Sequence, residues 1–223
     1  RKLAYVSFEN NRSEVYVQTL RSGARERVSS RTGVNGAPAW SPDGRSLALT
    51  LSRDDGNLDI YTLNLGSQIL TRLTRRPSID TEPAWAPDGG SIYFTSDRGG
   101  APQVYRVAAD GEGEPERVTF EGRYNARPRA SADGERLALV HNDRGNYRIA
   151  AFDLVRGYLQ VLTDGALDES PSFAPNGETL IYAPREGGRG VLATVSIDGR
   201  IRQRISASEG DVREPAWSPF PVY

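Results

Sequence analysis

Four acidic or amide residues recur in this sequence at a nearly fixed spacing. They are Asp43, Asp88, Asp133 and Asn176, which lie 45, 45 and 43 residues apart, each directly before a glycine. A series of carboxylates could supply acid–base groups or oxygen ligands for a cation. Each residue, however, follows a proline or an alanine, and Pro-Asp-Gly is the pattern of a tight turn. We therefore interpret the series as turn residues.

Other candidates for catalysis are few. The sequence has no cysteine, which excludes disulfides, thiolate metal sites and a cysteine nucleophile. The sequence has one histidine, His141. It contains no Gly-x-Ser-x-Gly motif whose serine this histidine could activate, and no second histidine for a zinc site. The glycine-rich segment at 187–190 is interpreted as a hairpin turn, because no helix follows it that could bind phosphate. The sequence predicts a protein that is not an enzyme and that requires no cofactor.

The turn residues belong to a longer repeated segment, Pro-Ala-Trp-Ser-Pro-Asp-Gly. Its copies begin at Pro38, Pro83, Pro128, Pro171 and Pro215, which are 45, 45, 43 and 44 residues apart. A period in the forties filled with short alternating segments indicates a β-propeller, in which each repeat is one four-stranded blade. One blade cannot bury its own apolar face, so the core must lie between blades. The aromatic residues in one register of the repeat are interpreted as this core: Trp40, Trp85, Phe173 and Trp217.

We predict an all-β fold, a single domain over residues 1–223 with five four-stranded blades. The chain starts inside a blade, because Lys2–Val6 matches the second strand of a repeat. It ends inside a blade, because Glu214–Pro219 matches the first strand. The last strand is therefore expected to pair beside Lys2–Ser7 and to close the ring within one monomer. The predicted blades are 1–30 with 213–219, then 36–76, 81–120, 126–164 and 169–208.

The composition limits the classes of partner. The 223 residues carry a net charge of -1 and a pI of about 6.0, which gives no general attraction to nucleic acid or to an anionic membrane surface. No apolar run approaches the ~18 residues that a membrane span needs. The first residues contain neither methionine nor a signal peptide, and we interpret the chain as a mature or excised domain. We expect no nucleic-acid partner and no direct membrane insertion.

One polar set remains after these exclusions. Three residues before each leading proline stand Asn35, Asp80, Asn125, Asp168 and Val212, and neighbouring positions add Thr81, Glu82, Arg127, Glu169, Arg213 and Glu214. In a propeller the segments that precede the inner strands lie on one face, around the mouth of the channel. Two interpretations stay open: the Asn and Asp residues shape the loops, or the set is a polar collar for a partner peptide or for calcium. Because the collar is more acidic than basic, we expect it to favour a partner that presents Lys or Arg.

Several segments resemble a known family. They are Val34–Gly44 (VNGAPAWSPDG), Thr81–Pro83 (TEP), Phe94–Arg98 (FTSDR), Pro102–Tyr105 (PQVY), Leu167–Pro171 (LDESP) and Pro215–Phe220 (PAWSPF). In these segments the chain resembles the TolB family, the periplasmic component of the bacterial Tol-Pal envelope system. The likeness covers nearly the whole chain in order. It is carried by the loops, since prolyl-oligopeptidase-like propellers share the repeat itself.

The resemblance implies a periplasmic, non-enzymatic adaptor. Such propellers bind the peptidoglycan-associated lipoprotein Pal at the channel-mouth face, support outer-membrane integrity and cell division, and are exploited there by bacteriocin translocation segments. Carried over by position, 34–37 and 80–82 would contact Pal, although Val34 replaces a histidine often found in the family. The predicted partner-binding residues are Val34, Asn35, Gly36, Ala37, Asp80, Thr81, Glu82, Asn125, Arg127, Asp168, Glu169, Arg213 and Glu214.

The resemblance also has departures. TolB proteins have an N-terminal α/β domain and six blades, whereas this sequence contains neither that domain nor a sixth repeat. Two alternatives follow: the gating propeller of a prolyl-oligopeptidase-like serine peptidase, or an engineered five-blade propeller that has lost binding.

Overall fold

The computed structural model describes residues 1–52, 56–205 and 210–218. Within these residues the regular structure consists of 20 β-strands and no helix, so no helix is long and apolar enough to cross a membrane. The chain divides into two compact units, Arg1–Val118 and Thr119–Tyr223.

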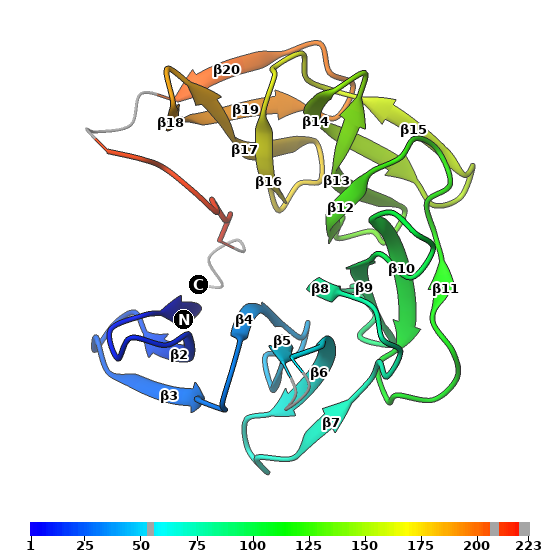
Figure 1. Cartoon of the computed structure of the whole chain (residues 1–223). Helices are drawn as coiled ribbons and strands as arrows, with labels where there is room; N and C mark the ends of the chain where they lie inside the picture. The colour runs from blue at the N-terminus through cyan, green and yellow to red at the C-terminus, as the bar shows by residue number, and fades with distance from the viewer. Residues whose placement is uncertain (53–55, 206–209, 219–223) are drawn as a thin grey trace. The chain divides into compact units, whose positions relative to one another are not determined.

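Unit 1 contains three antiparallel sheets, whose strands follow the chain order (Figure 1). The first has three strands, the second and third have four. Their strands are β1 (Lys2–Ser7), β2 (Glu14–Thr19) and β3 (Arg25–Ser29); β4 (Asn35–Trp40), β5 (Ser46–Ser52), β6 (Leu58–Asn64) and β7 (Leu70–Arg72); and β8 (Asp80–Trp85), β9 (Ser91–Ser96), β10 (Gln103–Ala108) and β11 (Glu116–Arg117).

Unit 2 contains two sheets of the same kind. The two-residue strand β18 pairs only with the end of β17, on the hairpin predicted at 187–190. The strands are β12 (Asn125–Ala130), β13 (Arg136–Asp143), β14 (Asn146–Asp153) and β15 (Tyr158–Val161); and β16 (Asp168–Phe173), β17 (Thr179–Glu186), β18 (Arg189–Gly190), β19 (Leu192–Ser196) and β20 (Arg202–Ile205).

The hairpin turns form as the sequence predicts. The Asp43 carboxylate accepts hydrogen bonds from the Ser41 hydroxyl at 2.6 Å and from the Arg45 amide at 3.0 Å. The equivalent Asn176 accepts from the Glu178 amide at 3.1 Å. Side chains that bind amides two residues further along stabilise such turns, and the interpretation of this series as turn residues is confirmed.

The apolar core lies between neighbouring sheets in each unit. In unit 1, Val15 and Val17 of β2 pack with Leu49 of β5, and Ile60 of β6 packs with Phe94 of β9. In unit 2, Ile149, Leu180 and Tyr182 belong to one cluster that joins both sheets. The strands β5, β9 and β13 therefore bury side chains on two faces, which explains why their apolar residues run almost continuously.

The repeated aromatic residues support this core. The Trp85 indole N–H donates to the carbonyl of Ala39 in the neighbouring sheet at 3.1 Å, and Trp40 and Phe173 pack against the clusters of their units. Trp217 differs, because it remains 40% exposed.

The prediction of an all-β propeller with five antiparallel blades is confirmed. One local prediction is wrong: residues 214–218 form no strand in the described part of the chain. The Trp217 amide donates to the Ser172 hydroxyl at 3.2 Å instead of to a neighbouring backbone. The pairing of this segment with β1 would be a contact between the two units, and it stays a prediction. The single domain and the monomeric state also stay predictions.

Candidate functional site

Residues predicted to form loops instead begin the first strands of the repeats. Asn35, Asp80, Asn125 and Asp168 are the first residues of β4, β8, β12 and β16. Their exposed fractions are 0%, 0%, 0% and 2%. Side chains buried to this degree have no surface for a partner.

Asn35 uses its side chain to hold the preceding loop. Its carbonyl oxygen accepts from the Ser29 hydroxyl at 2.7 Å and from the Arg31 amide at 3.0 Å. Its amide group donates to the carbonyls of Ser13 and Arg31, at 3.1 and 2.7 Å. A fully bonded buried amide of this kind fixes a loop, as other buried polar groups do.

Asp80 is held by a buried cation. The Arg98 guanidinium donates to its carboxylate at 2.8 Å, and their side chains are 8% and 0% exposed. The same guanidinium lies 5.3 Å from the ring centre of Phe94 and 5.0 Å from that of Tyr105. Arg98 therefore neutralises the carboxylate inside the apolar core of the blade.

In unit 2 the equivalent residues have different partners. Asn125 donates to the carbonyl of Glu121 at 2.7 Å, and its oxygen lies 2.9 Å from Nδ1 of His141. Burial lowers the pKa of His141, so its neutral ring donates to Asn125 and has a structural role. Burial raises the pKa of Asp168, whose Oδ2 has no hydrogen-bond partner within the described residues.

The structure therefore favours the loop-shaping interpretation for these four side chains. It also weakens the expectation of an acidic collar, because Arg98 neutralises Asp80 and Arg127 pairs with Glu214 at 2.5 Å. Within the described ranges no three His, Asp or Glu side chains gather as a metal site would require. Calcium binding by these loops stays a prediction.

A feature that the sequence did not reveal is a strained residue before each leading proline. Five non-glycine residues at this position have a left-handed backbone: Ala37 (φ 46°), Glu82 (57°), Arg127 (56°), Ser170 (57°) and Glu214 (51°). The first four of these residues lie in β4, β8, β12 and β16, and in each of these strands the pairing register shifts at this residue, as in a β-bulge. The bulge turns the side chain out of the ladder. Ser170 was missing from the predicted set, although its place before Pro171 marks it.

In unit 1 the strands β4 and β8 present side chains next to these bulges. The Glu82 carboxylate accepts from the Thr95 hydroxyl at 3.0 Å, and its amide donates to the Thr50 hydroxyl at 3.2 Å. Thr81 and the Gly36–Ala37 pair are half-buried. Val34, the residue directly before β4, is 43% exposed.

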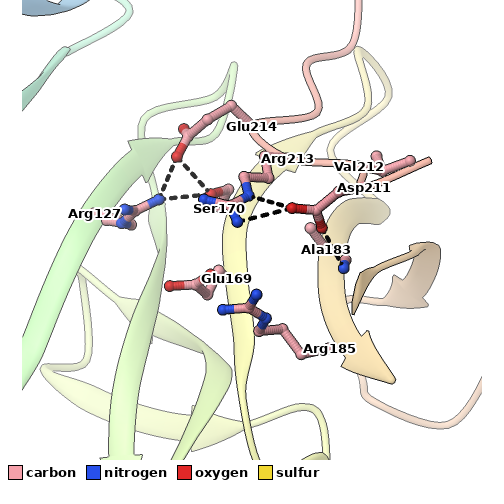
Figure 2. A pocket seen from close by; sticks show the side chains of 10 residues that line it. Arg127, Glu169, Ser170, Ala183, Arg185, Asp211, Val212, Arg213 and Glu214 are labelled. Atoms are coloured by element: carbon pink, nitrogen blue, oxygen red, sulfur yellow. Dashed lines mark hydrogen bonds and ion pairs between the residues drawn. The ribbon is translucent and has the colours of Figure 1, made fainter. Parts of the chain in front are cut away.

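In unit 2 the predicted residues Arg127, Glu169, Arg213 and Glu214 line one pocket, with Ser170 and Arg185 (Figure 2). The Arg127 guanidinium donates to the Ser170 hydroxyl at 2.6 Å and to Glu214 at 2.5 Å. The Ser170 hydroxyl donates to the same Glu214 oxygen at 3.0 Å. Three pre-proline residues of successive repeats are thus joined in one network.

The wall of this pocket is completed by the segment that carries Glu214. The Asp211 carboxylate pairs with Arg213 at 2.8 Å and accepts from the Gly190 amide at 2.6 Å. The Val212 amide donates to the Gly190 carbonyl at 3.0 Å. The three arginines and three carboxylates of the pocket balance in charge, so it offers several ionic contacts without a net attraction for one sign.

The comparisons with known proteins agree with this architecture. The TolB beta propeller domain model matches residues 1–221. The Tol-Pal system protein TolB of Xanthomonas campestris pv. campestris (strain B100) is 59% identical over 222 residues, which are 99% of this chain and 50% of that protein. The crystal structure of TolB from Acinetobacter baumannii is 49% identical, with a TM-score of 0.91 over 98% of this chain and 54% of that one.

A more distant likeness shows the fold alone. The structure of a puromycin-hydrolysing peptidase of Mycobacterium tuberculosis is 18% identical, with a TM-score of 0.66. The matched region covers 91% of this chain and 35% of the peptidase. The present chain spans about half the length of the TolB proteins that it matches. The chain belongs to the TolB β-propeller family.

Proposed function

We propose that this chain is a non-enzymatic, periplasmic scaffold of the Tol-Pal system that binds Pal through the segments preceding β4, β8, β12 and β16. The supporting relationship is the 59% identity to a Tol-Pal system protein over 99% of the chain. By this binding it contributes to outer-membrane integrity and cell division. Bacteriocin translocation segments are further candidate ligands of the same segments.

The observation that carries the proposal is that two of these segments are held by hydrogen bonds and expose an apolar side chain. The equivalent residues Val34 and Ile79 are 43% and 53% exposed. The Val34 amide donates to the Ser52 hydroxyl at 2.7 Å, and the Ile79 amide donates to Asp97 at 2.8 Å. Apolar side chains on a backbone that is already ordered lose little conformational entropy when a protein partner covers them.

A catalytic role has less support. His141 is 8% exposed and its Nδ1 is engaged by Asn125, so the ring is poorly placed to act as a general base. The gating-propeller alternative relies on likenesses below 20% identity, which reflect only the shared fold.

Substitution of the exposed apolar residues tests the proposal. Val34→Glu and Ile79→Glu should each weaken binding of the purified Pal domain, measured by calorimetry, by about tenfold or more, because each places an unpaired charge in the interface. Ile69→Glu is the matched control, since Ile69 is 64% exposed on the β6–β7 hairpin of the same unit.

The outcomes separate the alternatives. Loss of affinity in the first two variants only would support the proposed face. Equal affinity in all three would place Pal elsewhere. If the unsubstituted chain does not bind Pal, the proposed function is wrong for this five-blade chain.

A further inference from the structure

The two segments that lead into β4 and β8 carry only basic charge. Residues 30–34 and 74–79 contain no Asp or Glu, and their three arginines are Arg31, Arg75 and Arg76. All three residues are exposed. The equivalent segments of unit 2, at 120–124 and 164–167, contain one arginine and two acids. The basic charge is therefore a property of these two segments and not of the repeat.

Two of the three arginines are not neutralised by an acid of the described structure. Arg76 pairs with Glu114 at 3.6 Å, and both side chains are exposed. Among the residues that the structure describes, no carboxylate forms an ion pair with Arg31 or Arg75. Their guanidinium groups stand in solvent, where they can bind a carboxylate from outside the chain.

The acids that contact the second segment are engaged with other groups. The Asp80 carboxylate accepts from the Ser78 hydroxyl at 3.1 Å and is neutralised by Arg98 inside the blade. The Asp97 carboxylate is half-buried and accepts from the Ile79 amide at 2.8 Å. These contacts hold the backbone of the segment and leave its arginines to solvent.

Each basic segment also exposes one large apolar side chain. Val34 follows Arg31 by three residues and Ile79 follows Arg75 by four, and the two apolar residues are 43% and 53% exposed. The strands that follow the segments lie in neighbouring sheets, since the Glu82 amide of β8 donates to the Thr50 hydroxyl of β5 at 3.2 Å. The two segments thus present cations and apolar side chains on one face of unit 1.

We propose that residues 30–34 and 74–79 form a basic surface, called the arginine surface below, which binds an acidic segment of the partner. Arg31 and Arg75 each pair with an Asp or Glu of that segment, and apolar side chains of the partner cover Val34 and Ile79. The inference rests on the proposed function, since the partner is the protein that binds this face. For unit 1 it reverses the expectation of a partner that presents Lys or Arg.

Neutralisation of each arginine tests the proposal. Arg31→Gln and Arg75→Gln should each weaken binding of the purified Pal domain about twofold to fivefold at low salt, the range of one exposed ion pair. The difference from the unsubstituted protein should shrink as salt is added, because salt screens exposed charges. Arg45→Gln is the matched control, since the Arg45 side chain is 82% exposed on the β4–β5 turn of the same unit. It should bind Pal as the unsubstituted chain does.

Two substitutions at one position separate the sign of the charge from the loss of apolar contact. Val34→Lys and Val34→Glu both remove the apolar side chain and introduce a charge. An acidic partner segment attracts the lysine and repels the glutamate, so Val34→Lys should bind Pal severalfold more tightly than Val34→Glu. The reverse order would show a basic partner and would overturn the proposal.

The remaining outcomes are also decisive. If the unsubstituted chain binds Pal and the variants Arg31→Gln and Arg75→Gln bind it equally well or more tightly, the arginine surface is wrong while the proposed function stands. If Arg45→Gln weakens binding as much, the effect is one of net charge and the surface is wrong. If the two variants keep their affinity for Pal but lose binding to phosphatidylglycerol vesicles, the surface binds an anionic lipid instead. If the unsubstituted chain does not bind Pal, both proposals fail.

Discussion

Asp80 and Asp168 occupy the same position of the repeat but have different electrostatic surroundings. Arg98 lies against Asp80, and neutral amides take the place of the acid in Asn35 and Asn125. Around Asp168 the facing groups are the Thr163 hydroxyl, the Gly165 amide, Asp164 and Arg148, and burial dominates to raise its pKa. At the residue scale, the repeat tolerates an acid without a buried counter-charge in this one blade.

Asp168→Asn should therefore stabilise the protein at neutral pH, by on the order of 1 kcal/mol. The folded pKa is raised, so the protonated form is favoured in the fold. In the unsubstituted protein, the contribution of protonated Asp168 to stability is complete below the unfolded pKa of about 4. This contribution is lost as the pH rises through the folded pKa of Asp168. Urea unfolding of both proteins at pH 4 and pH 7.5 checks this: the advantage of the variant should appear at the higher pH only. An equal difference at both pH values would contradict it.

At the scale of the strand, the bulge before each leading proline places a non-glycine residue in the left-handed region. For Ala37 this costs about 1 kcal/mol, since a Cβ crowds the carbonyl there. Ala37→Gly should therefore leave stability unchanged or raise it by up to about 1 kcal/mol, despite the added freedom of the unfolded chain.

Ala39, two residues further along the same strand, is the matched control. It lies in regular pairing with Ala48, so Ala39→Gly should destabilise the protein by about 1 kcal/mol. Thermal unfolding of the two variants measures the difference. Equal destabilisation would show that the backbone at Ala37 is not strained.

The strands illustrate what a sequence can reveal. The strand predicted at Lys2–Ser7 is present as β1, and the period of the repeat predicted the series of small antiparallel sheets, because each repeat is one blade. The bulges were not predicted, because a backbone dihedral angle leaves no pattern of side chains in the sequence. The burial of Asn35 was not predicted either, because it depends on a contact with Ser13, which lies 22 residues earlier in the chain. Residues 34–37 and 80–82 were identified as a candidate site, but not which of their side chains are exposed.

At the scale of the whole molecule, the first blade has three described strands where the second and third have four. Within the described residues β1 pairs only with β2, which would leave one edge of the strand open to other chains. The repeat supplies a candidate for that edge in residues 214–218, whose sequence matches the inner strand of the other blades.

If this segment completes the first blade, the β1 amides that are not bonded to β2 should be protected from hydrogen exchange in the intact chain. Removal of residues 213–223 should abolish that protection in unit 1, whereas removal of 219–223 should not. The alternative is that the segment serves only unit 2, where Glu214 binds Arg127 and the Trp217 amide binds Ser172. In that case the longer truncation would change exchange near β16 and β18 alone, and those β1 amides would exchange rapidly in the intact chain as well. Hydrogen exchange measured by NMR resolves both units in one experiment, and rapid exchange in intact β1 would refute closure of the ring.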